Sequence, residues 1–439
     1  MLRPAFGLCV CLLALVSTTR ADDWPQWMGP GRDGIWQETG IIREFPQDGL
    51  PVAWRAEVGL GYSGPAVAAG RVYVMDYLLE SGEITNNSGA RDKLTGQERV
   101  LCFDAKDGTL LWKHAYARDY NLSFPGGPRC TPTVFADKVY ALGAEGNLWC
   151  LDAKKGQVIW SVDFVKDYGV TVSTWGVAAH PLVVDDTVYC VVGGEGSVAV
   201  AFDRLTGKEK WRALTSTESG YCPPTLIEQA GVKQLLIWDA KALNSLNPQT
   251  GAVYWSVELE PRYGMAIAAP RQWKDQLLAS NFGVAALLKL GTDKPAAEVL
   301  WQGKPKNAVY SANATPIIED GIAYGCDIDT GALMAVRLND GERLWQTMQA
   351  TTGSARRDAY GTAFLVKNDD VFFLFNELGD LILAKLTPQG YQEIARSHLL
   401  DPTNTAFGRP VLWSPPAYAN RCLFARNDKE LICVRLGEK

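Results

Sequence analysis

The hydrophobic positions of this chain fall into short apolar runs that alternate with turn residues. Residues 131–160 are typical: they read TPTVFAD, KVYALG, NLWCLD and QVIW, and glycine or acidic residues separate most of these runs. Runs of this length with a period of two predict β-strands, and no stretch shows a sustained helical period. We therefore expect four successive strands in this region and an all-β protein.

The four-strand pattern repeats along the chain, and a tryptophan closes each clear copy. In five copies a glycine stands four residues before the tryptophan, and in four of these an Asp or Asn stands eight residues before it. We expect the acidic or amide residue to accept amide hydrogen bonds in a hairpin turn, the glycine to take a positive φ, and the tryptophan to pack between neighbouring repeats. The glycine and tryptophan pairs are Gly108 and Trp112, Gly156 and Trp160, Gly207 and Trp211, Gly251 and Trp255, and Gly341 and Trp345.

Three further copies are incomplete and bring the total to eight. Trp301 closes a copy without the glycine, Trp54 closes the second half of a copy, and the copy around Ile394 has lost its tryptophan. Successive tryptophans lie 44 to 58 residues apart, which is the period of a four-stranded propeller blade. The chain ends where a blade still needs its last strand, and residues 50–54 supply an orphan strand. We therefore predict an eight-bladed β-propeller of four-stranded blades, whose ring is closed by N- and C-terminal strands in one blade.

The propeller is expected to occupy residues 50–439, and a segment over residues 22–49 leads into it. The longest interval between tryptophans marks an insertion at residues 76–99, which we predict to be a polar loop between the second and third strands of the first blade. A long loop on a rigid scaffold is either a functional lid or an insertion that the fold tolerates without a function, and both interpretations stay open.

Composition places the chain among ordinary soluble proteins. Of its 439 residues, 47% are hydrophobic and 21% are charged, and the net charge of −6 is spread without any basic block, which argues against nucleic-acid binding. The apolar run at residues 8–16 is too short to span a membrane but has the features of a secretory signal, so we expect residues 1–21 to be removed. We expect a soluble, monomeric, exported protein, periplasmic or extracellular, without a transmembrane span.

The repeats resemble the tryptophan-docking motifs of the pyrroloquinoline quinone (PQQ) repeat proteins. The resemblance covers residues 50–439, and the sequence DWPQWMGPGRDG at residues 23–34 is similar to the N-terminal segment of secreted bacterial PQQ-like propellers of unassigned role. The group includes quinoprotein alcohol dehydrogenases and the outer-membrane β-barrel assembly lipoprotein. The resemblance therefore implies the propeller fold without fixing an activity.

Candidate binding residues cluster in the loops that enter the innermost strands, because these loops share one face of the disc. Aromatic and guanidinium groups around a central channel would suit a small planar or anionic ligand, through stacking and bidentate hydrogen bonds. The alternative is that these side chains plug the channel and stack on one another. The candidate ligand- or cofactor-binding residues are Tyr62, Arg129, Trp175, Tyr221, Tyr263, Tyr310, Asn313, Arg357, Tyr360 and Arg409.

Other loops of that face contribute carboxylates, among them Asp327 and Asp329 in the sequence CDIDTG. With Asn313 their oxygens could hold calcium, but the later glutamate of a calcium loop is missing, and a hairpin turn is the favoured reading. The three histidines stand apart without HxxxH or HExxH spacing, so no metal site is predicted.

Catalytic motifs are scarce, because the chain has no GxSxG elbow, no P-loop, no adjacent cysteine pair and no CxxCH haem site. The favoured hypothesis is a binding or scaffold module that takes a protein partner or a small ligand through its loop-rich face. The cofactor stays unknown.

The second hypothesis, implied by the resemblance, is a PQQ-dependent oxidoreductase that acts on an alcohol or sugar. PQQ would stack on Trp175, arginines would bind its carboxylates, and Asp327 would act as base beside a calcium ion. The third is an assembly factor that docks a partner's loops or extends its sheet. Because no cysteine directly follows the apolar run, a lipid anchor like that of the assembly lipoprotein is not expected.

Overall fold

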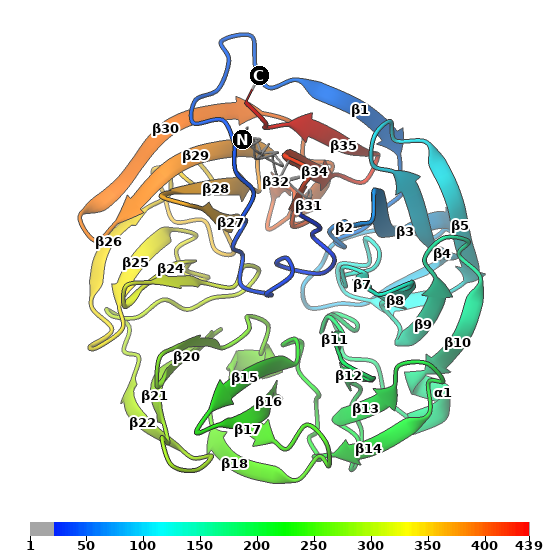
Figure 1. Ribbon diagram of the computed structural model, residues 1–439, viewed down its shortest axis with the longest axis vertical. Coiled ribbons are helices and arrows are strands. Elements are labelled where there is room, and N and C mark those ends of the chain that lie inside the picture. Colours follow the sequence, from blue (N-terminus) through cyan, green and yellow to red (C-terminus); the bar gives the residue numbers. More distant parts are fainter. Residues whose placement is uncertain (1–21, 439) are drawn as a thin grey trace, which may run out of the picture.

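Eight antiparallel sheets surround a central channel in the computed structural model, which describes residues 22–438 (Figure 1). Each sheet is a blade of four strands that runs from an innermost strand at the channel to an outermost strand at the rim, so the predicted all-β, eight-bladed propeller is confirmed. The expected signal segment, residues 1–21, lies outside the described residues. Within residues 22–438, no helix is long and apolar enough to cross a membrane.

The first four blades follow one another along the chain. Blade 1 consists of β2 (Ala66–Ala68), β3 (Arg71–Ser81), β4 (Asp92–Asp104) and β5 (Leu110–Ala117). Blade 2 consists of β7 (Thr133–Phe135), β8 (Lys138–Leu142), β9 (Asn147–Asp152) and β10 (Val158–Asp163). Blade 3 consists of β11 (Leu182–Val184), β12 (Thr187–Val191), β13 (Ala199–Asp203) and β14 (Glu209–Ala213). Blade 4 consists of β15 (Thr225–Gln229), β16 (Val232–Trp238), β17 (Ala242–Leu246) and β18 (Val253–Glu258).

The remaining blades complete the ring. Blade 5 consists of β19 (Arg271–Trp273), β20 (Gln276–Asn281), β21 (Val284–Leu290) and β22 (Ala297–Gln302). Blade 6 consists of β23 (Ile317–Glu319), β24 (Ile322–Cys326), β25 (Leu333–Arg337) and β26 (Arg343–Thr347), and blade 7 of β27 (Ala363–Asn368), β28 (Val371–Asn376), β29 (Asp380–Thr387) and β30 (Gly390–His398). Blade 8 combines β33 (Ala417–Ala419), β34 (Cys422–Arg426) and β35 (Glu430–Arg435) with β1 (Val52–Glu57). Outside this plan lie β6 (Tyr120–Leu122), the hairpin of β31 (Asn404–Ala406) and β32 (Arg409–Val411), the helix α1 (Phe164–Tyr168) and the 3-10 turn η1 (Arg262–Gly264).

The tryptophan that closes a blade joins it to the next blade. Trp112 on β5 donates its indole N–H to the backbone carbonyl of Ala153, in the turn after β9 of blade 2, at 3.1 Å. This bond confirms that the tryptophan packs between neighbouring blades. The same bond, at 2.7 to 3.0 Å, joins Trp54 to Ala105, Trp160 to Arg204, Trp211 to Pro248, Trp301 to Leu338 and Trp345 to Thr387.

The turn that receives each indole explains the acidic and glycine positions of the repeat. In blade 3 the Asp203 carboxylate accepts the backbone N–H groups of Leu205 and Thr206, at 3.2 and 2.9 Å. In blade 4, Gly251 has a φ of 75°, and a Cβ built on it would lie 2.6 Å from the ring of Trp211. The backbone conformation and the tryptophan contact both require glycine. The roles predicted for the two positions are confirmed.

Trp255 is an exception, because the next blade lacks the turn that would receive its indole. Its N–H donates instead to the side-chain carbonyl of Gln234, on β16 of the same blade, at 2.9 Å. Gln234 is fully buried, and the same oxygen accepts the hydroxyl of Ser245 at 2.8 Å. A buried indole N–H needs an acceptor, and here the acceptor comes from within the sheet.

The first and last strands of the chain close the ring together. β1 is the outermost strand of blade 8 and pairs antiparallel with β35, so that Arg55 lies opposite Ile432. The Arg55 guanidinium also binds the Glu430 carboxylate at 2.7 Å. The predicted closure by N- and C-terminal strands in one blade is confirmed, and no junction of the ring is left open.

The segment that precedes β1 crosses one end of the channel (Figure 1). Trp24 and Val67 on β2 exchange two backbone hydrogen bonds of 2.8 Å, and Trp36 donates its backbone N–H to the carbonyl of Lys367 on β27. Both tryptophans are buried in the largest apolar cluster that residues 22–438 form. The segment therefore ties blade 1 to blade 7 across the channel.

The insertion at residues 76–99 is mostly a strand hairpin, so the predicted polar loop is wrong. β3 and β4 extend beyond the blade, and only residues 82–91 lie outside strands. Burial alternates along β4, which is a strand period that the many polar residues obscured. The polar residues are paired: the Arg99 guanidinium donates to both oxygens of Asp76, at 2.8 and 2.6 Å.

Deleting residues 431–439, and with them nearly all of β35, should prevent ring closure, because β1 would lose its partner. We expect this variant to lose the cooperative thermal transition of the intact chain, followed by circular dichroism. A variant that lacks only residues 438 and 439 keeps β35 and should melt close to the intact chain. An unchanged melting temperature after deletion of β35 would contradict the closure.

Two glycines of blade 4 allow the tryptophan contact to be tested apart from the backbone conformation. Gly251 and Gly231 both have positive φ, at 75° and 67°, but a Cβ on Gly231 would meet nothing within 4 Å. Gly231→Ala should cost about 1–2 kcal/mol, from the left-handed conformation alone. Gly251→Ala should cost about 1–3 kcal/mol more, because the methyl group crowds Trp211. Urea unfolding measures the loss of unfolding free energy in both variants. Equal losses would contradict the proposed contact between Gly251 and Trp211.

Candidate functional site

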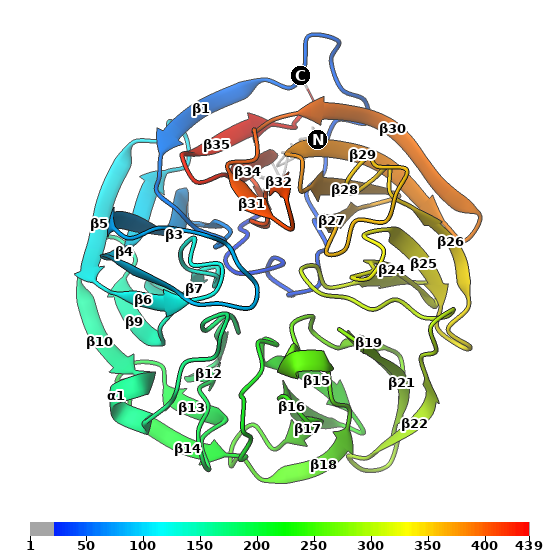
Figure 2. The ribbon, with the colours of Figure 1, turned by 180° about the vertical axis from the view of Figure 1, so that it is seen from behind.

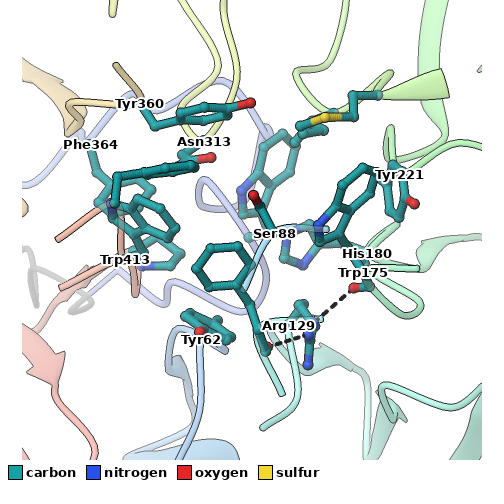
Figure 3. A pocket seen from close by; sticks show the side chains of 17 residues that line it. Tyr62, Ser88, Arg129, Trp175, His180, Tyr221, Asn313, Tyr360, Phe364 and Trp413 are labelled. Carbon is teal, nitrogen blue, oxygen red and sulfur yellow. Dashed lines mark hydrogen bonds between the residues drawn. The ribbon is translucent and has the colours of Figure 1, made fainter. Parts of the chain in front are cut away.

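An aromatic pocket lies at the end of the channel where the loops enter the innermost strands (Figure 3). Its volume is about 220 Å³, and nine of its lining side chains are Phe, Tyr or Trp. Among the described residues that line it, Arg129 is the only one with a permanent charge, and none is a carboxylate. The lining residues are Trp27, Tyr62, Ser88, Phe124, Arg129, Trp175, Ala178, His180, Tyr221, Met265, Ile267, Asn313, Tyr360, Phe364, Phe407, Trp413 and Pro415.

Six of the ten candidate binding residues line this pocket. Of the other four, Tyr263 is 73% exposed, and Arg357 is also exposed. Tyr310 is buried in an apolar cluster beside the pocket, and Arg409 is paired with Glu377. The six that line the pocket are Tyr62, Arg129, Trp175, Tyr221, Asn313 and Tyr360.

The Arg129 guanidinium is occupied by the backbone around it. Its Nε donates to the carbonyl of Trp175 at 3.1 Å, and its Nη2 donates to the carbonyls of Ser123 and Phe124 at 3.2 and 2.6 Å. Nη1 donates to the carbonyl of Gly127. Four of the five N–H groups of a guanidinium are therefore engaged. Arg129 holds the loops of blades 2 and 3 together, as the plugging alternative expects.

Arg409 also has an internal partner. The Glu377 carboxylate is fully buried and accepts the Nε of Arg409 at 2.8 Å and the indole N–H of Trp413 at 3.0 Å. A buried carboxylate needs such donors, because an unpaired charge is costly away from water. The pair anchors the β31–β32 hairpin to blade 7 and positions the Trp413 ring in the pocket wall.

Asp327, the candidate catalytic base, lies in a turn and does not line the pocket. It is 1% exposed, and its carboxylate accepts the backbone N–H and the hydroxyl of Thr330, at 3.1 and 2.8 Å. The other oxygen accepts the backbone N–H of Tyr310 at 3.2 Å and lies 3.4 Å from the Arg343 guanidinium. Asp327 therefore organises a hairpin turn and has no contact with the pocket.

Two hairpins from neighbouring blades extend toward the centre of the ring (Figure 2), and both contribute residues to the pocket. Residues 82–91, at the tip of the insertion, contribute Ser88, and the β31–β32 hairpin contributes Phe407. Asn86 donates its side-chain amide to the side-chain oxygen of Asn404 at 2.7 Å, which links the two hairpins. This contact favours the reading of the insertion as a lid.

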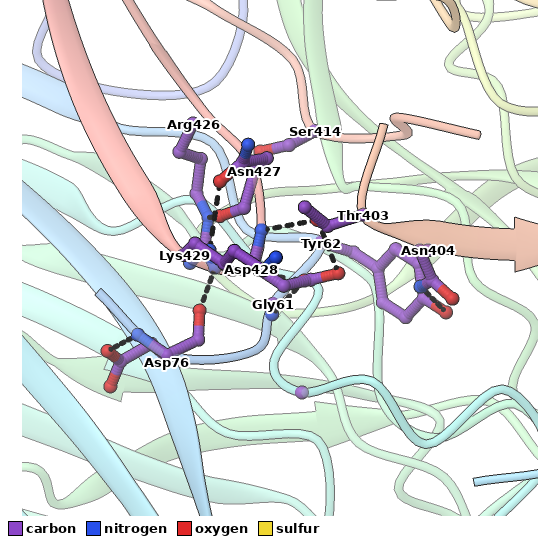
Figure 4. A network of polar contacts seen from close by, with 12 residues as sticks. Gly61, Tyr62, Asp76, Thr403, Asn404, Ser414, Arg426, Asn427, Asp428 and Lys429 are labelled. Carbon is purple, nitrogen blue, oxygen red and sulfur yellow. Dashed lines mark hydrogen bonds and ion pairs between the residues drawn. The ribbon is translucent and has the colours of Figure 1, made fainter. Parts of the chain in front are cut away.

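A buried polar network fixes the loop that carries Tyr62, where blades 8 and 1 meet (Figure 4). Arg426 on β34 is fully buried and donates to three backbone carbonyls, among them that of Met75 at 2.8 Å. Asp428 accepts the backbone N–H of Gly61 at 3.0 Å. The residue next to Tyr62 is thereby held by a side chain from the last blade.

Sequence reasoning missed several pocket residues, above all Trp27 and His180. Trp27 comes from the N-terminal segment, and its ring stacks on that of His180 with centroids 5.0 Å apart and planes 12° from parallel. Phe407 stacks in the same way on Tyr360, at 4.6 Å and 9°. The Trp27–His180 pair forms the floor of the pocket, and the Phe407–Tyr360 pair forms part of its wall. The sequence signal that could have indicated the floor was the second tryptophan of the motif DWPQWMGPGRDG.

His180 is a neutral donor. The backbone N–H of Thr131 donates to its Nδ1 at 2.9 Å, so the neutral ring carries its proton on Nε2. Burial, and then the nearby charge of Arg32, lowers the pKa of His180 well below its usual range. The ring therefore offers the pocket an N–H group without a positive charge.

The propeller and its tryptophan-docking turns define a protein of the PQQ-repeat class. A family profile described as outer membrane protein assembly factor BamB matches residues 96–347 and 239–439, so the chain belongs to this PQQ-like repeat family. No curated protein sequence matches the chain.

Solved structures share the fold at low sequence identity. BamB from Moraxella catarrhalis has a TM-score of 0.55 at 17% identity, over 87% of this chain and 96% of that one. Quinohemoprotein alcohol dehydrogenase from Comamonas testosteroni has a TM-score of 0.63 at 12% identity, over 95% of this chain and 81% of the enzyme. A europium-containing methanol dehydrogenase has a TM-score of 0.61 at 12% identity, over 94% of this chain and 89% of that one. The shared feature is the fold.

Replacing His180 should change how stability depends on pH. Because the pKa of His180 is lowered in the folded state, its stabilising contribution is present above about pH 6.5, the unfolded value, and is lost as the pH falls below it. Between pH 6.5 and 5, the unfolding free energy of the wild type should fall more steeply than that of His180→Asn, by up to about 1.4 kcal/mol per pH unit. The amide oxygen of asparagine can still accept the N–H of Thr131. If urea unfolding gave the same pH dependence of the unfolding free energy for both proteins, the conclusion that the His180 ring is neutral in the folded state would be wrong.

Proposed function

We propose that this chain is an exported binding module whose aromatic pocket holds a planar, uncharged ring of its ligand. The observation that carries the proposal is the lining, in which nine aromatic side chains surround one arginine whose N–H groups are largely engaged. Aromatic walls favour a planar ligand through stacking and edge contacts. A volume of about 220 Å³ leaves room for one or two fused rings, since a cavity of about 150 Å³ holds benzene.

Polar groups near the pocket support a ligand that also forms neutral hydrogen bonds. Nε2 of His180 carries a proton, and no acceptor for it lies among residues 22–438. The side-chain amide nitrogen of Asn313 is buried and likewise has no acceptor within the described chain. Such groups favour a ring that bears a hydroxyl or carbonyl oxygen.

PQQ with calcium, which the oxidoreductase hypothesis requires, does not fit the residues present. PQQ carries three carboxylates, while Arg129 has one N–H group left and Arg357 and Arg409 do not line the pocket. Asp327 is enclosed in its turn, and no group of three or more His, Cys, Asp or Glu within the described chain could hold a metal ion. The donor set therefore supports binding rather than quinone chemistry.

Export and the kind of partner belong to the same proposal. Export rests on the signal-like features of residues 1–21. Membership of a family described by the outer membrane protein assembly factor BamB supports a protein as an alternative carrier of the aromatic ring. In that case the ring would be a side chain of the partner.

Calorimetric titration with 2-naphthol, a planar ring system with one hydroxyl group, tests the pocket. We expect saturable binding to the wild type and affinity at least about tenfold lower for Ser88→Trp, because the larger ring would fill the mouth. Ala90→Trp is the matched control: Ala90 lies in the same loop, is exposed and does not line the pocket. Its affinity should equal that of the wild type.

A parallel titration with PQQ and calcium, with a dye-linked oxidation assay over alcohols and sugars, tests the alternative. We expect neither saturable PQQ binding nor dye reduction. Dye reduction would overturn the binding-module proposal in favour of an oxidoreductase. Equal 2-naphthol affinity in both tryptophan variants would show that the aromatic pocket is not its site.

A further inference from the structure

A second cavity lies at the other end of the channel, beneath the N-terminal segment. Its volume is about 530 Å³, within the range of about 300–1,000 Å³ typical of ligand sites. Residues 25–27 and 30–33 and the innermost strands β7, β11, β15 and β19 of blades 2 to 5 bound it. These strands begin beside the aromatic pocket and end at turns on the opposite face, so the two cavities lie at opposite ends of the channel. Trp27 lines both.

Two arginines line this cavity and hold the N-terminal segment in place. Arg271 on β19 donates Nη1 to the carbonyl of Arg32 at 2.8 Å and Nη2 to the carbonyl of Asp33 at 3.1 Å. Arg32 in turn donates Nη1 to the carbonyl of Pro181 at 3.0 Å and Nη2 to that of His180 at 3.2 Å. Within the described residues, no ion pair joins either guanidinium to a carboxylate.

The two guanidinium groups keep N–H groups in reserve. Of the five N–H groups of a guanidinium, Arg271 uses two, both on backbone carbonyls. Arg32 uses three, the third on the side-chain oxygen of Gln26 at 3.3 Å. Burial lowers the pKa of Arg32 to about 10, which still leaves it charged at neutral pH. The neutral carbonyl oxygens accept some of the guanidinium hydrogen bonds, but they do not neutralise the two positive charges.

The acidic residues around the cavity do not cancel both charges. Burial lowers the pKa of Arg271, and the charge of Asp33 offsets this only in part. The Asp33 carboxylate accepts the backbone N–H of Ile35 at 3.0 Å, within its own turn. Asp185 lies at the rim, where its side chain is 80% exposed and 3.8 Å from Lys233. The cavity is therefore lined by two partly buried guanidinium groups and by the Asp33 carboxylate, one oxygen of which is engaged in its own turn.

The strands that bound the cavity add neutral donors. β11 and β15 are innermost strands, and each pairs with a neighbour on one side only. Backbone N–H groups on the other edge face the channel and are available to a ligand. The two guanidinium groups and the backbone N–H donors together form a surface suited to an anion.

We propose that this second cavity binds a small ligand that carries an oxyanion, either a carboxylate or a phosphate, and that Arg32 and Arg271 hold it. A planar guanidinium can donate two parallel hydrogen bonds to either group, which an ammonium cannot do. The site is independent of the function proposed for the aromatic pocket, because Arg32 and Arg271 line the second cavity and do not line that pocket.

Calorimetric titration of the full chain with succinate, and separately with inorganic phosphate, tests the site at ionic strength held constant with sodium chloride. We expect saturable binding of at least one probe, weakened at least about tenfold in Arg271→Gln, because a hydrogen-bonded charge is removed. Arg212→Gln is the matched control: Arg212 is exposed on β14 and lies 3.5 Å from Glu209 at the surface. Its affinity should equal that of the wild type.

The two probes distinguish the sources of the oxyanion, since succinate offers only carboxylates. If Arg271→Gln fails to fold, Arg271→Lys can replace it. This variant keeps the positive charge but loses the two parallel N–H donors of the guanidinium, so it should still bind the probe more weakly than the wild type. No saturable binding of either probe to the wild type would overturn the proposal, as would unchanged affinity in a folded Arg271 variant. Binding of 2-naphthol should be unaffected in these variants, so failure here is distinct from failure of the aromatic pocket.

Discussion

The hydrogen bond from the closing tryptophan of one blade to the turn of the next is the interaction on which the ring depends. At Trp112 and Ala153 it joins two sheets that share no backbone ladder. The glycine of the turn leaves room for the ring, so bond and contact occur together. Because every closing indole except that of Trp255 finds its acceptor on the neighbouring blade, most blades are complete only within the ring. The innermost strands are thereby held in fixed relative positions, and loops distant in the sequence can build one pocket.

The same interaction explains how far the fold could be predicted. It requires particular residue types at fixed offsets, so the sequence shows it directly, and the number of blades and their closure follow from it. Prediction failed where another contact had replaced the repeated one. Gln234 takes over as acceptor for Trp255 from a different strand, with no motif to announce it. The pairing of Asp76 with Arg99 likewise makes a polar stretch look like a loop although it is a strand hairpin.

The candidate site was less predictable, because a sequence shows which groups are present and not which of them are already engaged. Loops that enter the innermost strands do line the aromatic pocket, and Trp175 is among their lining residues. Arg129 and Arg409 carry the chemistry of anion recognition, yet backbone carbonyls and Glu377 occupy them. Arg271, which keeps three guanidinium N–H groups free beside the second cavity, lies on an inner strand at the other face. Burial and existing partners therefore decide which guanidinium can serve a ligand.

The shared blade also has a consequence for the order in which the molecule assembles during synthesis. β1 is among the first strands to leave the ribosome, and its partner β35 is the last. The N-terminal segment also reaches its final position late, since the backbone N–H of Trp36 donates to the carbonyl of Lys367 on blade 7. Blades 1 to 7 can form their sheets as the chain grows, but the ring cannot close until β35 has been synthesised. A chain truncated near its end therefore carries an open ring with an unpaired strand edge, which protein quality control can recognise.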